Sequence, residues 1–174
     1  MVKKNIYFKK YFLYSLLCVF TILIIDGFFE FHFQKNIFWQ DQTLFLQINR
    51  ISSFFGDELI LGSYLSRIFP LLAGLIFLNT RKSLQSIFFI IILMILIDIL
   101  TFISGERSAF AFIILSAFLM IFCLNQYKFI RLITFLLTIL LLFYIQAFNK
   151  NIASRMIYKT LDQLSTSNYY KDRY

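Results

Sequence analysis

The sequence predicts an all-α membrane protein, a bundle of about five transmembrane helices. Hydrophobic residues make up 60% of the 174 residues and the chain has a single proline, a composition outside the range of ordinary soluble domains. The apolar residues also fall in long runs between short polar turns and do not alternate as in strands. A run of about 20 apolar residues is long enough for one helix to cross a bilayer.

The positive charges indicate membrane topology and not a nucleic-acid surface. The formal net charge is +8, but the lysines and arginines stand in small clusters between apolar runs, as the positive-inside rule describes. After the N-terminal lysines, the clusters are Arg81 with Lys82 and Lys128 with Arg131, on alternate turns, and none of these turns holds an acid. We therefore expect a cytoplasmic N-terminus, a periplasmic C-terminus and no nucleic-acid partner.

Five apolar runs account for the expected helices. The first follows a lysine-rich start and is too long for a signal peptide, and no small-residue cleavage site comes after it, so we interpret it as an uncleaved span. The expected spans are residues 11–29, 59–78, 84–103, 107–124 and 132–148. Residues 149–174 are expected to form a periplasmic tail, an amphipathic or loosely ordered polar segment.

The stretch between the first two spans, residues 30–58, is polar and rich in aromatic residues, including Trp39. We expect it to form an interfacial layer on the periplasmic side. It holds the only histidine, His32, which has no second ligand nearby and so predicts no metal site. Cys18 and Cys123 both lie inside apolar runs, so we expect them to be packing residues and not a disulfide.

Two charged residues interrupt the expected spans. Arg67 lies about 12 Å from the start of the second span, at 1.5 Å per residue, and Asp98 lies about 9 Å from the periplasmic end of the third. Charged groups at such depth need partners. Their similar depths predict an ion pair between them, and the alternative is that Arg67 extends toward the interface.

The most distinctive stretch is the turn at residues 103–110 (ISGERSAF), because Glu106 and Arg107 stand between two long apolar runs. In the expected topology, the second and fourth spans both begin at the periplasmic face. Their helix N-termini, with free N–H groups and positive dipole ends, then share a layer with Arg50, Arg67 and Arg107. One guanidinium group can donate two parallel hydrogen bonds to the oxygens of a phosphate, so this layer suits a phosphate.

The acidic residues of this layer have two possible roles. Glu58 and Glu106 either orient the arginines or cap the helix starts. The sequence leaves both interpretations open.

Two stretches resemble a known family. Residues 50–70 (RISSFFGDELILGSYLSRIFP), followed about thirty residues later by ISGERSAF, resemble the O-antigen ligase and O-antigen polymerase superfamily of bacterial inner-membrane glycosyltransferases. Residues 26–38 also resemble what precedes the first motif in such proteins, and the resemblance covers roughly residues 26–124.

The resemblance implies an undecaprenyl-pyrophosphate-linked oligosaccharide as substrate, transferred at the periplasmic face to a second glycan acceptor or polymerised there. It implies no metal and no nucleotide-sugar cofactor. The pyrophosphate, which is the leaving group, would be held by Arg50, Arg67 and Arg107, with Glu58, Asp98 and Glu106 in support.

Members of this family usually have about ten or more spans and a large periplasmic loop that supplies further catalytic residues, including a candidate base. The resemblance therefore implies that this chain is the N-terminal part of a larger protein and that residues 149–174 are the start of this loop. Two other classes stay open: a small non-enzymatic membrane protein that packs against partners, and a fragment of a lipid-linked glycan flippase or transporter. A transporter predicts charges along the depth of several spans, whereas the sequence confines them to Arg67 and Asp98.

Overall fold

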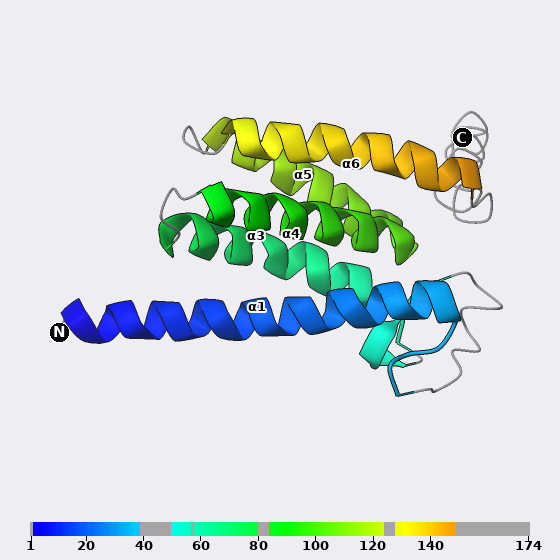
Figure 1. The fold of residues 1–174 in the computed structure, drawn as a ribbon, viewed down its shortest axis with the longest axis horizontal. Coiled ribbons are helices and arrows are strands. Elements are labelled where there is room, and N and C mark those ends of the chain that lie inside the picture. Colours follow the sequence, from blue (N-terminus) through cyan, green and yellow to red (C-terminus); the bar gives the residue numbers. More distant parts are fainter. Residues whose placement is uncertain (1, 39–49, 57, 80–83, 124–127, 149–174) are drawn as a thin grey trace, which may run out of the picture.

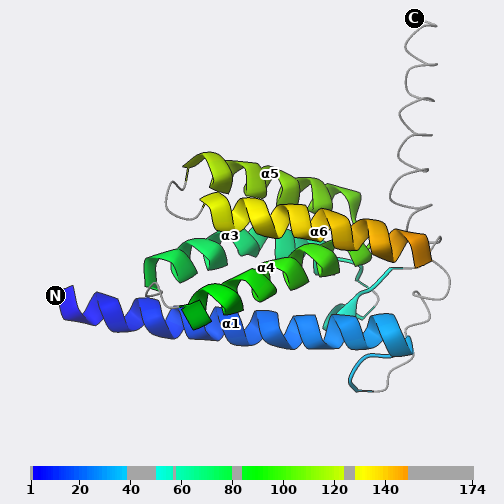
Figure 2. The same cartoon turned by 45° about the horizontal axis from the view of Figure 1, so that its top comes forward.

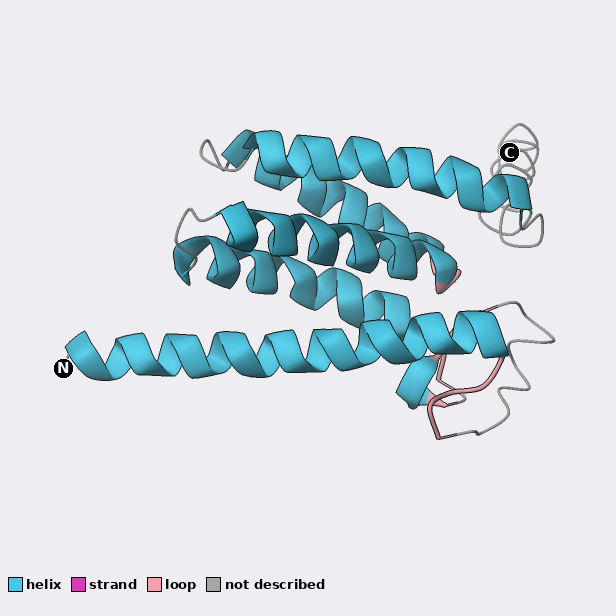
Figure 3. Ribbon diagram, in the orientation of Figure 1, coloured by secondary structure: helices cyan, strands magenta, loops and turns pink. Residues whose placement is uncertain are grey.

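The computed structural model describes residues 2–38, 50–56, 58–79, 84–123 and 128–148. These ranges contain helices and loops and no strand (Figure 3). The helices are α1 (Val2–Phe33), α3 (Leu61–Asn79), α4 (Leu84–Ile103), α5 (Arg107–Cys123) and α6 (Lys128–Phe148), with a short 3-10 turn η1 (Ser53–Phe55) before α3. The predicted all-α fold is confirmed.

The five helices lie side by side in one bundle (Figures 1 and 2). The longest, α1, runs along one side and packs against α3 and α4, and α5 and α6 cover the other side. The pair α3 and α5 and the pair α4 and α6 also pack directly. The starts of α3 and α5 and the ends of α1 and α4 are thereby brought to one end of the bundle.

Three helical segments are long and apolar enough to cross a membrane: Tyr7–Phe33, Leu61–Asn79 and Gln85–Ile103. A shorter apolar helix covers Arg107–Cys123. Large apolar side chains are exposed on the outside of the bundle, among them Leu78, Phe88, Phe122 and Leu140. An apolar outer surface around a packed interior is what lipid-facing helices require, so the outside of the bundle suits contact with lipid.

Small residues allow α3 and α5 to approach closely. Gly62 and Ser66 of α3 and Ala109, Ser116 and Ala117 of α5 are all buried. A Cβ atom at Gly62 would meet Ser104 Oγ and would lie 3.2 Å from the Cβ atoms of Ala109 and Glu106. Helices that pack in lipid commonly use such residues, because no larger side chain then separates the backbones.

Several expected boundaries need correction. α1 continues through Glu30 to Phe33, so the polar stretch does not begin at residue 30. α6 begins at Lys128, which places Arg131 inside a helix and not in a basic turn. Cys18 and Cys123 are free and exposed on the outside of the bundle, so they are not core packing residues.

Other predictions fall on residues that the structure does not describe. These are the interfacial position of Trp39, the basic cluster at Arg81 and Lys82, and the periplasmic tail at residues 149–174.

Candidate polar site at one end of the bundle

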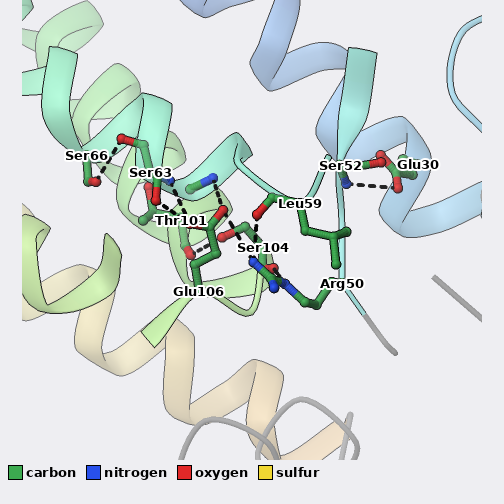
Figure 4. Close-up of polar contacts among 10 residues, drawn as sticks. Glu30, Arg50, Ser52, Leu59, Ser63, Ser66, Thr101, Ser104 and Glu106 are labelled. Atoms are coloured by element: carbon green, nitrogen blue, oxygen red, sulfur yellow. Dashed lines mark hydrogen bonds and ion pairs between the residues drawn. The ribbon is translucent and has the colours of Figure 1, made fainter. Parts of the chain in front are cut away.

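Glu106 joins the start of α3 to the turn between α4 and α5 (Figure 4). Its Oε1 accepts a hydrogen bond from the Gly62 backbone N–H at 2.9 Å, and its Oε2 accepts from the Ser63 N–H at 3.1 Å and from the Ser63 hydroxyl. These N–H groups belong to the first turn of α3, where no helical carbonyl can accept from them. The carboxylate also lies at the positive end of the helix dipole. Glu106 therefore caps α3 from 44 positions away along the chain.

Arg50 connects this cap to the loop before α3. Its Nη2 donates to the Leu59 carbonyl at 2.7 Å, and its Nε donates to the Ser104 carbonyl at 3.4 Å (Figure 4). Its Nη2 also lies 3.5 Å from Glu106 Oε1. The Arg50 side chain is 17% exposed, so the charge faces mainly inward. Glu106 thus caps α3 and also lies against Arg50, whereas Glu58 is exposed.

Two acidic residues of α1 hold the segment that follows Arg50. Glu30 accepts hydrogen bonds from the Ser52 and Ser53 backbone N–H groups, and Asp26 accepts from the Ile37 N–H and from the Ser53 hydroxyl. Asp26 and Glu30 are both fully buried. They stand one helical turn apart, so both face the same loop. α1 thereby fixes the position from which Arg50 reaches the α3 cap.

The other predicted site residues lie nearby but differ in their exposure and contacts. Arg67, on α3, is exposed, and within the described ranges its guanidinium makes no hydrogen bond or ion pair. It lines a groove of about 250 Å³ between α3 and α5, together with Pro70, Phe112 and Leu115. Arg107 is the first residue of α5 and is half-buried, and Glu58 is exposed. The structure therefore joins Arg50 to Glu106 and leaves Arg67 in a groove at the outside of the bundle.

The predicted pair between Arg67 and Asp98 is wrong. Asp98 binds Arg131 of α6 through two hydrogen bonds, of 2.8 and 3.1 Å, and accepts a third from the Thr138 hydroxyl at 3.4 Å. Arg131 is 1% exposed and its guanidinium lies over the Phe69 ring, 5.0 Å from the ring centroid. The physical reason is that the Asp98 side of α4 packs against α6, whereas Arg67 faces outward beside α5. Asp98 accordingly does not support the arginine layer.

The spacing of polar residues in the sequence indicates the buried polar residues that we did not predict. Arg131, Thr134 and Thr138 follow one another at spacings of three and four, which places them on one face of a helix, and all three are buried. Asp26 and Glu30 show the spacing of four within the first apolar run. Polar residues at helical spacing in an apolar run predict an inward-facing polar stripe, not the edge of a loop.

No cluster of three His, Cys, Asp or Glu side chains that could hold a metal ion occurs among the residues that the structure describes. His32 is exposed, and its ring meets the edge of Phe33, with centroids 4.7 Å apart.

The fold and this site define the class: a helical bundle with an ordered layer of charged residues at one end, in whose described part three segments are long and apolar enough to cross a membrane. No known protein family, curated protein or solved structure matches the chain. The resemblance of residues 50–70 and 103–110 to a family therefore depends on those residues themselves.

Proposed function

We propose that this protein takes part in surface polysaccharide assembly as an O-antigen ligase or polymerase type of glycosyltransferase. Its substrate would be an undecaprenyl-pyrophosphate-linked oligosaccharide in the bacterial inner membrane. One observation supports this most: the two stretches that carry the family resemblance, far apart in the sequence, meet at one end of the bundle. Arg50 of the first contacts Glu106 of the second, and Glu106 caps the helix that the first contains.

The proposal includes the full topology expected from the sequence. α5 and α6 would cross the membrane together with α1, α3 and α4, with the N-terminus in the cytoplasm. With five spans, the end of α6 would lie on the opposite side of the membrane from the N-terminus. The layer of Arg50, Glu106 and Arg107 would then face the periplasm, where lipid-linked glycans are joined.

The contacts of Glu106 decide which groups are left for a phosphate. The Gly62 and Ser63 N–H groups already donate to Glu106, so the α3 N-terminus is not an open anion site. Phosphate binding in this proposal falls to the arginines. Arg67 offers an exposed guanidinium, Arg107 lies at the positive end of α5, and Arg50 holds the layer together and adds charge.

The chemistry assigned to these arginines is electrostatic. An acceptor hydroxyl attacks the anomeric carbon, the bond from that carbon to the pyrophosphate oxygen breaks, and the pyrophosphate leaves with the electron pair. Guanidinium groups positioned beforehand stabilise the negative charge that grows on the leaving group. The base that takes the hydroxyl proton is expected in the periplasmic loop that the family resemblance implies.

Substitution in the intact protein tests this function. Arg50→Ala, Arg67→Ala and Arg107→Ala should each abolish surface glycan extension or attachment, measured as the glycan ladder on a gel. The amount of protein in the membrane should stay unchanged for Arg67→Ala, because the Arg67 guanidinium makes no hydrogen bond or ion pair within the described ranges. Lys9→Gln, a charge removal at the opposite end of the bundle, should leave the ladder normal. A normal ladder in any two of the arginine variants would refute the assignment.

A second function, movement of a lipid-linked glycan across the membrane, is favoured by the buried charges. The expectation that charges within the spans are confined to Arg67 and Asp98 is wrong, because Asp26, Glu30 and Arg131 are also buried in helices. Charged groups within spans often mark transport pathways. If Asp98→Asn with Arg131→Met stopped glycan from reaching the outer face while a supplied outer-face substrate was still joined, transport would be the better assignment.

A further inference from the structure

A second hollow lies at the opposite end of the bundle from Arg50 and Glu106. It is an open hollow with a volume of about 590 Å³, lined by the first part of α1, the end of α3 and the start of α4. Figures 1 and 2 show these three segments together at the end where α1 begins. The volume is in the range of small-molecule binding sites. The hollow, which we call the α1 groove, takes no part in the site described above.

The polar residues of the α1 groove lie at the ends of the segments that are long and apolar enough to cross a membrane. Asn79 is the last residue of one membrane-crossing segment, Gln85 is the first of another, and Lys10 lies in the first turn of the third, Tyr7–Phe33. Three separate segments therefore place donor groups at one level. Tyr14 and Ser86 add hydroxyl groups to the lining. An ammonium group with amide and hydroxyl donors around it matches a phosphate diester and its ester-linked glycerol.

The floor of the α1 groove is apolar. Leu13, Ile76 and Ile90 are 7%, 5% and 2% exposed and close it from inside. Leu17 lines it seven positions after Lys10, which is about 10 Å deeper along α1. A ligand that fits has a negatively charged head at the membrane surface and a hydrocarbon chain that runs inward from it.

We propose that the α1 groove binds an anionic glycerophospholipid of the phosphatidylglycerol type. Its phosphate pairs with Lys10 and accepts from Asn79 and Gln85, and the upper part of one acyl chain lies on Leu13, Leu17 and Ile90. Basic hollows between membrane helices recognise anionic headgroups in this way, because one ammonium near the surface favours a negative lipid. The inference does not depend on the proposed glycosyltransferase function.

Native mass spectrometry of the full chain in detergent, titrated with phosphatidylglycerol or phosphatidylcholine of equal chain length, tests this proposal. The wild-type chain should retain one phosphatidylglycerol in preference to phosphatidylcholine. Lys10→Gln should reduce phosphatidylglycerol affinity about fivefold, the effect of one basic residue near a lipid headgroup. Lys9→Gln is the matched control, because it removes the same charge from the neighbouring residue, which does not line the groove, and it should change nothing.

A variant in the apolar part of the α1 groove distinguishes lipid binding inside the groove from general attraction of lipid to the protein surface. Leu17→Trp narrows the inner part of the groove and should lower the affinity for both lipids, while the ratio of the two affinities stays unchanged. Equal losses for Lys9→Gln and Lys10→Gln, no preference in the wild-type chain, or no effect of Leu17→Trp would each overturn the proposal. Thermal unfolding of every variant, followed by circular dichroism, shows whether the fold is retained.

Discussion

Gly62 is the residue at which the packing of the bundle and the polar site meet. It donates its N–H to Glu106, and its lack of a side chain lets α3 approach Ser104 and Ala109. Gly62→Ala should therefore destabilise the protein by about 1–3 kcal/mol, the usual cost of inserting an atom into a filled space. The change is measured by thermal unfolding in detergent.

Gly74 provides a control for Gly62, because the same glycine-to-alanine change can be made there. It lies in the same helix, and a Cβ atom there would meet nothing within 4 Å. Gly74→Ala should stabilise the protein by about 0.5–1 kcal/mol, because alanine loses less conformational freedom in a helix than glycine does. If both alanine variants unfolded alike, the close approach at Gly62 would be wrong.

At the scale of single residues, the sequence placed Arg50 and Glu106 in one layer, but it gave Asp98 the wrong partner. Glu106 was identified from its place in a short turn, Arg50 was assigned to the same charged layer, and the two side chains do lie together. Asp98 was paired with Arg67 because depth along a helix can be counted from the sequence. The direction in which a side chain points around the helix depends on which neighbour the helix packs against, and depth alone does not contain that information.

Helices α4 and α6 are joined by the buried pair of Asp98 and Arg131. Both side chains are at most 2% exposed, so removing one partner leaves a charge in an apolar interior. Asp98→Leu or Arg131→Met alone should cost about 3–5 kcal/mol, whereas the double substitution should cost much less. A double-mutant cycle of thermal stability, or of protein level in the membrane, measures the difference.

The matching control for that cycle is Arg67→Met, which removes an arginine whose guanidinium makes no hydrogen bond or ion pair in the described part of the chain. It should leave stability unchanged and should not rescue Asp98→Leu. Rescue by Arg67→Met would restore the original pairing and contradict the structure.

At the scale of helices, the sequence was most successful for the third span. The expected bounds of the third span coincide with α4, Leu84–Ile103, because polar residues flank the run at both ends. The bounds of α1 and α6 were too short, since Glu30 and Arg131 were interpreted as loop residues. Inside the bundle both side chains have partners, which removes the cost that normally ends a membrane helix at a charge.

For the whole molecule, the proposed topology makes opposite ends of the helices accessible from opposite sides. In a background without Cys18 and Cys123, Glu58→Cys should react with a membrane-impermeant maleimide in intact cells. Lys128→Cys should react only after the membrane is permeabilised. The residues lie near the starts of α3 and α6, and labelling with the two sites reversed would show that the orientation is wrong.

The central claim is that the end of the bundle with Arg50, Arg67, Arg107 and Glu106 binds a lipid pyrophosphate, and direct binding of farnesyl pyrophosphate to the chain in detergent tests it. The wild-type chain should bind this probe at least about tenfold more tightly than farnesyl monophosphate. Arg67→Gln should lower the affinity about tenfold, as loss of a charge-assisted hydrogen bond does, and Lys9→Gln should not. Equal affinity for farnesyl pyrophosphate in the wild-type, Arg67→Gln and Arg107→Gln chains would contradict the claim.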